Sequence, residues 1–224
     1  MGAGEEGMPG PHRNRVTPLG EIAAAPLRGA WTGNRGCLHR GFEIVRPWAS
    51  HHFLVCALEF KGWHQTQWLP GRLTWLFFHD EAVAFAAGHR PCALCRRAAY
   101  NEYRGLFSAG GPPVGFDALD RQLHRERVDP RLRRRRRLHQ SSWAELPDGV
   151  FVLEAEHPEL VLGGELVAWS ADGYGKRRPR PERGMAPVVT PPSSVRVLAS
   201  GYPVQIDASA RWPRDRHSAA ASSE

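Results

Sequence analysis

Lysine is nearly absent from this sequence: Lys61 and Lys176 are its only lysines, although Lys and Arg together number 30. The chain also lacks any uninterrupted apolar run near the roughly 20 residues of a membrane-spanning helix. Residues 1–15 contain no apolar stretch of the kind found in secretory signals. Walker, Gly-x-Ser-x-Gly and Gly-x-Gly-x-x-Gly motifs are missing. We therefore expect a cytoplasmic protein whose positive charge is carried by arginine.

The composition bounds the size of the fold and the state of its cysteines. Hydrophobic residues make up 42% of the 224 residues, which is enough for one large or two modest domains with a core. Four cysteines in a cytoplasmic chain of this length are more commonly reduced, metal-bound or buried than joined in disulfides. The sequence therefore permits a metal site, but a chain of this size does not need a metal to form a stable fold.

The hydrophobic pattern and the helix caps predict an α+β protein. Alternating apolar residues predict a strand over 53–60, with Leu54 and Cys56 on one face, and aromatic residues predict another over 73–78. Asp80 is a good N-cap for a helix over 81–87, which Gly88 would end. The other expected elements are helices over 96–107, 117–128 and 192–199, strands over 150–154, 159–162 and 166–169, and an Arg- and Pro-rich loop over 176–183.

The strongest chemical signal is a Cys-x-x-Cys pair, Cys92 and Cys95, on a tight turn before a helix. Two thiolates at this spacing converge on one ion, which is typical of a structural Zn2+ site. The alternative is a pair of small buried residues at a helix start. A tetrahedral site needs two more ligands, for which the sequence offers Cys37 and His39 in a turn-rich loop, Cys56 on a strand and, as a weaker candidate, His64.

Basic residues provide the second signal. Residues 121–137 hold nine Arg against Glu126 and Asp129, so the excess positive charge of +7 is concentrated in this segment. Such an arm predicts contact with nucleic-acid phosphates, and DNA is the expected partner. A solvated loop is the alternative. The predicted contact residues lie in the arm and beside the cysteine pair: Arg90, Arg96, Arg97, Arg131, Arg133, Arg134, Arg135, Arg136 and Arg137.

The segment Leu73 to Cys95, LTWLFFHDEAVAFAAGHRPCALC, resembles the metal-binding N-terminal domain of the Ada type of alkyl-DNA repair protein. The shared features are an aromatic strand, an alanine-rich helix ending in Ala-Ala-Gly, and Arg-Pro-Cys-x-x-Cys. The resemblance implies a zinc site in which the first cysteine of a Cys-x-x-x-Cys pair accepts a methyl group from DNA. That pair would fall near residues 62–66, where this chain has no cysteine.

A wider series of short blocks, GNRG, LEFKG, PGRLT and GHRPC, is similar to a set of uncharacterised bacterial proteins and implies no activity. From these signals we expect three ordered parts: a zinc-stapled Ada-like domain over 16–107, a basic helical linker and arm over 108–140, and a β-rich module over 141–207. We expect residues 1–15 and the tail over 208–224 to be disordered. We expect a structural zinc site and DNA binding. The alternatives are a zinc-stabilised protein-interaction module and an enzyme acting on DNA, either a methyl acceptor or a nuclease.

Overall fold

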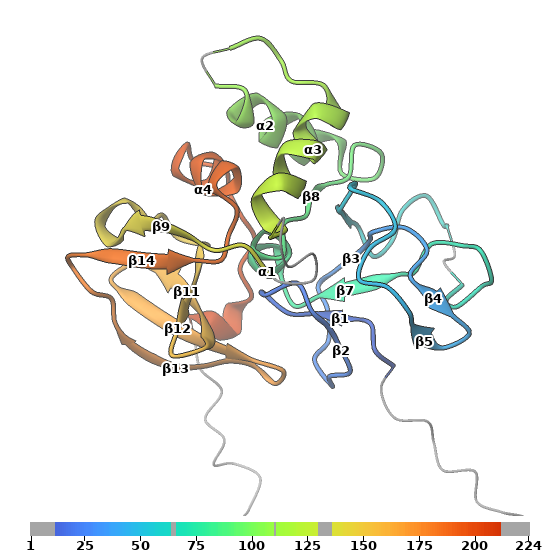
Figure 1. Ribbon diagram of the computed structural model, residues 1–224, viewed down its shortest axis with the longest axis horizontal. Coiled ribbons are helices and arrows are strands. Elements are labelled where there is room, and N and C mark those ends of the chain that lie inside the picture. Colours follow the sequence, from blue (N-terminus) through green and yellow to red (C-terminus); the bar gives the residue numbers. More distant parts are fainter. Residues whose placement is uncertain (1–11, 64–65, 110, 130–135, 212–224) are drawn as a thin grey trace, which may run out of the picture.

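The computed structural model describes residues 12–63, 66–109, 111–129 and 136–211. The fold is mixed α and β, with two six-stranded sheets on either side of a short central helix, α1 (Glu81–Ala86) (Figure 1). Among the described residues, no helix has the length and apolar character needed to cross a lipid bilayer.

Helix α1 is the common core of the molecule because its sequence, EAVAFA, is apolar except for Glu81, which is buried in an ion pair. All six of its residues are buried, as expected for a helix that is apolar all round. The Asp80 side chain accepts a hydrogen bond from the Val83 N–H at 2.8 Å, and Gly88 follows the helix with φ +80°. The predicted N-cap and C-terminal glycine are therefore confirmed.

The first sheet is built from short strands of the N-terminal half and has the order β2-β1-β7-β3-β6-β8. Most neighbours are antiparallel, but β6 runs parallel to β8 and β1 runs parallel to β7. A separate hairpin, β4 and β5, flanks the sheet. The bounds are β1 (Arg15–Val16), β2 (Ile22–Ala23), β3 (Trp31–Asn34), β4 (His39–Arg40), β5 (Glu43–Ile44), β6 (Leu54–Cys56), β7 (Leu76–Phe78) and β8 (Arg90–Pro91).

The second sheet is antiparallel throughout and has the order β13-β12-β11-β10-β14-β9. Three of its strands match those predicted. The segment predicted as a loop over 176–183 instead begins inside β13, whose arginines pair with glutamates of β12 and β11. The bounds are β9 (His139–Ser142), β10 (Phe151–Glu154), β11 (His157–Leu162), β12 (Glu165–Ser170), β13 (Gly173–Pro179) and β14 (Met185–Val188).

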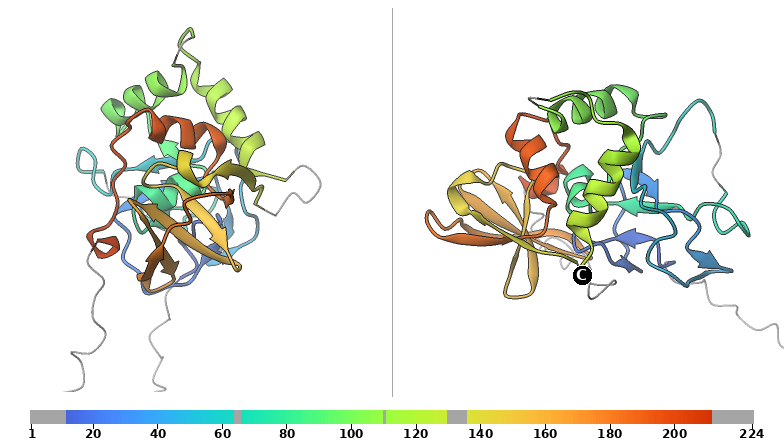
Figure 2. Two further views of the ribbon diagram at one scale, coloured as in Figure 1. Left: turned by 90° about the vertical axis from the view of Figure 1, so that its left-hand side faces the viewer. Right: turned by 45° about the horizontal axis from the view of Figure 1, so that its top comes forward.

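Three longer helices cover one side of the junction between the sheets (Figures 1 and 2). They are α2 (Arg97–Phe107), α3 (Phe116–Arg127) and α4 (Pro192–Ala199), each close to its predicted range. Helix α2 contacts both β8 of the first half and α4 of the second. Two short 3-10 turns, η1 (Trp143–Glu145) and η2 (Ala208–Ala210), complete the described elements.

The buried core is shared between the predicted N-terminal and C-terminal parts of the chain. Phe85 of α1, Tyr103 of α2 and Leu123 of α3 belong to one buried cluster with residues of the second sheet and α4. Helix α3 is thus a packed part of the core and not a linker. At the ends of the chain, Arg15 pairs with Phe77 in the first sheet and Ala210 is buried, although both were assigned to disordered segments.

Candidate metal centre

The parallel pairing of β6 with β8 brings two cysteines together from positions far apart in the sequence. Leu54 is opposite Arg90 and Val55 is opposite Pro91, and the Cys92 N–H donates to the Val55 carbonyl at 2.8 Å. Because the two strands are parallel, their carboxyl ends lie at the same edge of the sheet. Cys56 and Cys92, which come at or just after these ends, therefore lie side by side.

Cys95 completes a group of three thiols. The sulfur atoms of Cys56, Cys92 and Cys95 all lie within 4.8 Å of one another. Tetrahedral zinc with bonds of ~2.3 Å places its sulfur ligands ~3.8 Å apart, which is compatible with sulfur atoms that lie within this limit. Cys56 and Cys92 are buried and Cys95 is half-buried. The donor set and its geometry fit a soft divalent metal.

Backbone N–H groups point at these sulfurs, as is typical of a metal knuckle. The Leu94 N–H donates to the Cys92 sulfur at 3.4 Å, and the Ala57 N–H donates to the Cys95 sulfur. The Cys56 and Cys95 thiols also donate to Cys92, which lowers the pKa of Cys92 and raises the pKa of Cys56. Of these thiols, Cys92 is therefore the one most favoured to lose its proton and become a thiolate.

The start of α2 is held rigidly behind the knuckle. Arg96, one residue after Cys95, forms an ion pair with the buried Glu81 of α1 at 2.6 Å. Its guanidinium also lies 3.8 Å from the centroid of the Trp31 ring in β3. Because Arg96 contacts both α1 and the first sheet, the position of the thiols is tied to the centre of the molecule.

Two of the other predicted ligands lie elsewhere. In the antiparallel β3 and β6, Asn34 is level with Leu54, so Cys37 lies beyond the end of β6 opposite to Cys56. The His39 ring contacts Thr74 at 2.5 Å and the Leu69 carbonyl at 3.2 Å. Neither Cys37 nor His39 belongs to the thiol group found among the described residues. The two residues are close in the sequence, but neither joins Cys92. His64 is outside the described residues.

The arginines predicted to bind nucleic acid have different surroundings. Arg90 is buried and forms two hydrogen bonds with the Asp120 carboxylate, at 2.8 and 2.7 Å. The Arg136 side chain donates to the Val189 carbonyl, and Arg96 has the contacts given above. These three are therefore occupied within the protein. Arg97 and Arg137 are exposed, and Arg131, Arg133, Arg134 and Arg135 lie outside the described residues.

A second group of possible ligands consists of His51, His52 and Asp117. The His51 Nε2 atom lies 2.7 Å from an Asp117 oxygen, and the His52 Nδ1 atom lies 2.7 Å from an Asp120 oxygen. Because the nearby ring nitrogens already have carboxylate partners and the group is half exposed, it is a weaker metal site than the three thiols.

The chain was compared with family models, curated proteins and solved structures. None of them matches. The account of function therefore depends on the residues of this chain, and the Ada-like character of residues 73–95 stays a prediction.

Proposed function

We propose that Cys56, Cys92 and Cys95 bind a Zn2+ ion with a structural role. The observation that supports it is the approach of three sulfur atoms to within 4.8 Å of one another. When bound, the ion would join the end of β6 to the turn that begins α2. It would thereby fix the edge of the first sheet against the helices, as structural zinc does in other proteins.

The composition of the ligand shell argues for a structural ion and against methyl transfer. Cys37, the fourth cysteine of the chain, lies beyond the opposite end of β6, so the fourth ligand within this chain is nitrogen or oxygen. Three thiolates and a neutral ligand leave a zinc site with a net charge of about −1, whereas four thiolates leave about −2 and a more nucleophilic sulfur. The thiolates of this site are therefore suited to holding the ion.

The test is the zinc content of purified protein and its affinity in competition with a chelator. We expect one ion per chain, and Cys56→Ser should weaken binding by at least about 100-fold because it removes a direct ligand. Cys37→Ser is the matched control and should bind zinc like the wild type. A folded, metal-free wild type, or equal loss in both variants, would contradict the proposal.

Nucleic-acid binding is the second proposed function, and it is supported by the outer face of α3. Arg121 and Arg125 are one helical turn apart and exposed, and the Arg137 side chain reaches the Arg125 carbonyl at 3.3 Å. Arg121 is paired with Asp117, whereas Arg125 and Arg137 are exposed cations of the predicted arm. Phosphate contacts of this kind release counterions, so binding should weaken steeply with salt.

The double variant Arg125→Ala/Arg137→Ala tests this second function. We expect weaker binding to duplex DNA and a salt dependence that is shallower by about two phosphate contacts, measured by fluorescence anisotropy. Arg28→Ala, an exposed arginine in the first half of the chain, is the control. Absence of DNA binding at low salt would reject the function, and displacement of DNA by an acidic protein would favour an interaction module.

A further inference from the structure

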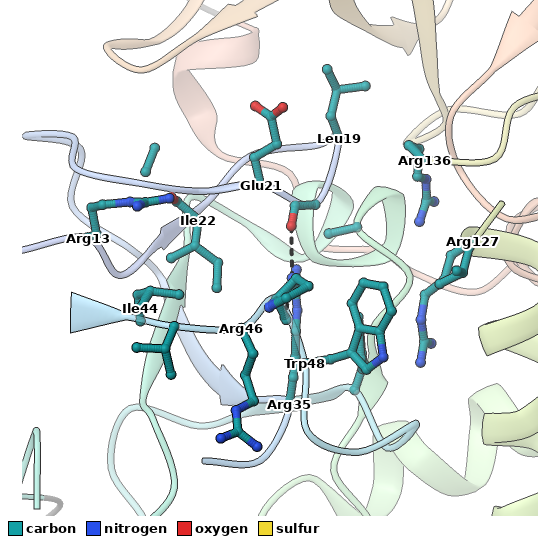
Figure 3. Close-up of a pocket in the computed structure, with 17 residues that line it drawn as sticks. Arg13, Leu19, Glu21, Ile22, Arg35, Ile44, Arg46, Trp48, Arg127 and Arg136 are labelled. Atoms are coloured by element: carbon teal, nitrogen blue, oxygen red, sulfur yellow. Dashed lines mark hydrogen bonds between the residues drawn. The ribbon is translucent and has the colours of Figure 1, made fainter. Parts of the chain in front are cut away.

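A cavity of about 470 Å³ opens between the first sheet, the β4-β5 hairpin and the end of α3 (Figure 3). Phe53 lines this cavity and precedes β6, whereas Cys56 ends β6, so the cavity and the thiols lie at opposite ends of one strand. We call it the arginine pocket because five arginines line it: Arg13, Arg35, Arg46, Arg127 and Arg136.

Two of these arginines are buried deeply and are held by neutral groups. Arg35 and Arg127 are 2% and 3% exposed. The Arg35 Nε atom donates to the neutral His89 ring at 3.1 Å, and its Nη1 atom donates to the Gly20 carbonyl at 2.8 Å. Arg127 donates to the Gly88 carbonyl at 2.8 Å and to the His51 carbonyl at 2.7 Å. Carbonyl and imidazole groups orient these guanidinium groups without neutralising them.

Part of the hydrogen-bonding capacity of the pocket is unused. The Nη2 atom of Arg35 and the Nε atom of Arg127 are buried, and neither has a hydrogen-bond acceptor within the part of the chain that the structure describes. Among the described residues, neither these two side chains nor Arg136 forms an ion pair with a carboxylate. Glu21 is the one acidic residue of the lining, and its side chain is exposed and directed away from Arg35 (Figure 3).

The electrostatics of the pocket favour an anion. Burial, followed by repulsion from Arg136, lowers the pKa of Arg35 to about 9, and burial lowers the pKa of Arg136 to about 9. Burial and then Arg35 lower the pKa of Arg127 below its usual range. Guanidinium groups nevertheless stay protonated at neutral pH. Stacking on the Phe53 ring, at 3.5 Å for Arg127, and the negative charge of Asp120 offset part of the cost of burying the Arg127 guanidinium.

The absence of a side chain at Gly88 leaves room for the Arg127 side chain. A Cβ atom at Gly88 would lie 2.6 Å from the Arg127 Cδ atom, so a larger residue there would displace the guanidinium. The GNRG and GHRPC blocks meet through the contact of Arg35 with His89, which are 54 residues apart in the sequence. Residues singled out in the sequence without an assigned role therefore converge on this pocket.

We propose that the arginine pocket binds the phosphate group of a small phosphorylated ligand, with the phosphate against Arg35 and Arg127. A phosphate group carries up to two negative charges on three terminal oxygens, so it can accept hydrogen bonds from several converging guanidinium groups better than a single carboxylate can. Ile22, Ile44 and the half-buried ring of Trp48 form apolar walls that suit a ligand with a ring, such as a nucleotide. This proposal goes beyond zinc and DNA binding and does not depend on either.

Isothermal titration calorimetry of the full-length protein at low ionic strength tests the proposal with three probes: adenosine 5′-monophosphate, inorganic phosphate and adenosine. Saturable binding of the nucleotide or of phosphate, without binding of adenosine, is expected. Tighter binding of the nucleotide identifies a nucleotide-like ligand, and equal binding identifies free phosphate. Absence of binding of both anions at millimolar concentration would overturn the proposal.

Variants assign the binding to the pocket. Arg35→Gln should weaken it by about 10- to 100-fold, because it removes a charged hydrogen-bond donor. Arg46→Ala changes only an exposed side chain at the rim, so it tests the site even if the buried variant does not fold, and about 2- to 5-fold weakening is expected. Arg183→Ala, exposed and outside the lining, is the control. Binding that both pocket variants leave unchanged would equally overturn the proposal.

Discussion

At the scale of single residues, Gly88 serves two purposes that no other residue type combines. Its φ of +80° ends α1, and the space that a side chain would fill holds Arg127. Helix-ending glycines can be predicted from sequence, as this one was. The close approach of Arg127 could not be, because it depends on α3 crossing a segment that precedes it by 39 residues.

Gly88→Ala should lower the free energy of unfolding by about 2–4 kcal/mol, from the strained backbone and the contact with Arg127. Chemical denaturation measures the effect. Gly105→Ala is the matched control: it lies within α2, nothing is within 4 Å of the added Cβ, and it should stabilise the protein by about 0.5–1 kcal/mol. Equal effects at the two positions would contradict this role of Gly88.

His124 makes the stability of the protein sensitive to acid. Burial, followed by repulsion from Arg127, lowers the pKa of His124 to about 4. Because the folded pKa is below the unfolded value of about 6.5, the folded state favours the neutral ring, and this stability is lost as pH falls from about 6.5 to about 4. His124→Gln should flatten that dependence by about 1 kcal/mol after screening of the half-exposed ring. Unfolding curves at several pH values measure it, and an unchanged slope would contradict the assignment.

At the scale of elements, the cysteine group shows what strand pairing adds to sequence patterns. The Cys-x-x-Cys spacing was enough to predict Cys92 and Cys95. Cys56 was one of four further candidates, because the sequence carries no sign that β6 pairs in parallel with β8. Cys37 and His39 were candidates because they are neighbours on one loop, yet the antiparallel register of β3 with β6 separates Cys37 from the site. Local spacing predicts half of this site, and tertiary pairing decides the rest.

The elements themselves were predicted where capping and periodicity are strong. The caps of α1 and the proline at the start of α4 placed both helices well. Strand β13 was missed because its arginines, which look like a loop in sequence, pair with glutamates across the sheet. The arginine pocket was missed for a related reason: Arg35 and Arg127 are far apart in the sequence and line one cavity only in the fold.

Helix α1 should be the element most sensitive to a cavity. Phe85 is fully buried and packs against Tyr103 and Tyr202, with ring centroids 5.3 Å apart in each case. Phe85→Ala should cost about 3–5 kcal/mol in the free energy of unfolding, measured by denaturant titration. Met185→Ala, 58% exposed on β14, should change it by less than about 0.5 kcal/mol. A small cost at Phe85 would show that α1 does not share a core with α2 and α3.

At the scale of the whole molecule, the three buried clusters all include residues of α1. A core shared in this way predicts one cooperative unfolding transition for both sheets. Zinc removal should therefore lower the melting temperature of that single transition and should not release the N-terminal half alone. Calorimetry with and without a chelator measures this. Two separate transitions in the metal-free protein would contradict the shared core.

The central claim is that Cys56, Cys92 and Cys95 are the sulfur ligands of one zinc ion, and X-ray absorption at the zinc edge tests it most directly. We predict three sulfur atoms at about 2.3 Å and one nitrogen or oxygen ligand at about 2.0–2.2 Å. The same spectrum should appear in Cys37→Ser. A zinc shell made only of nitrogen and oxygen, or one with four sulfur atoms, would contradict the account.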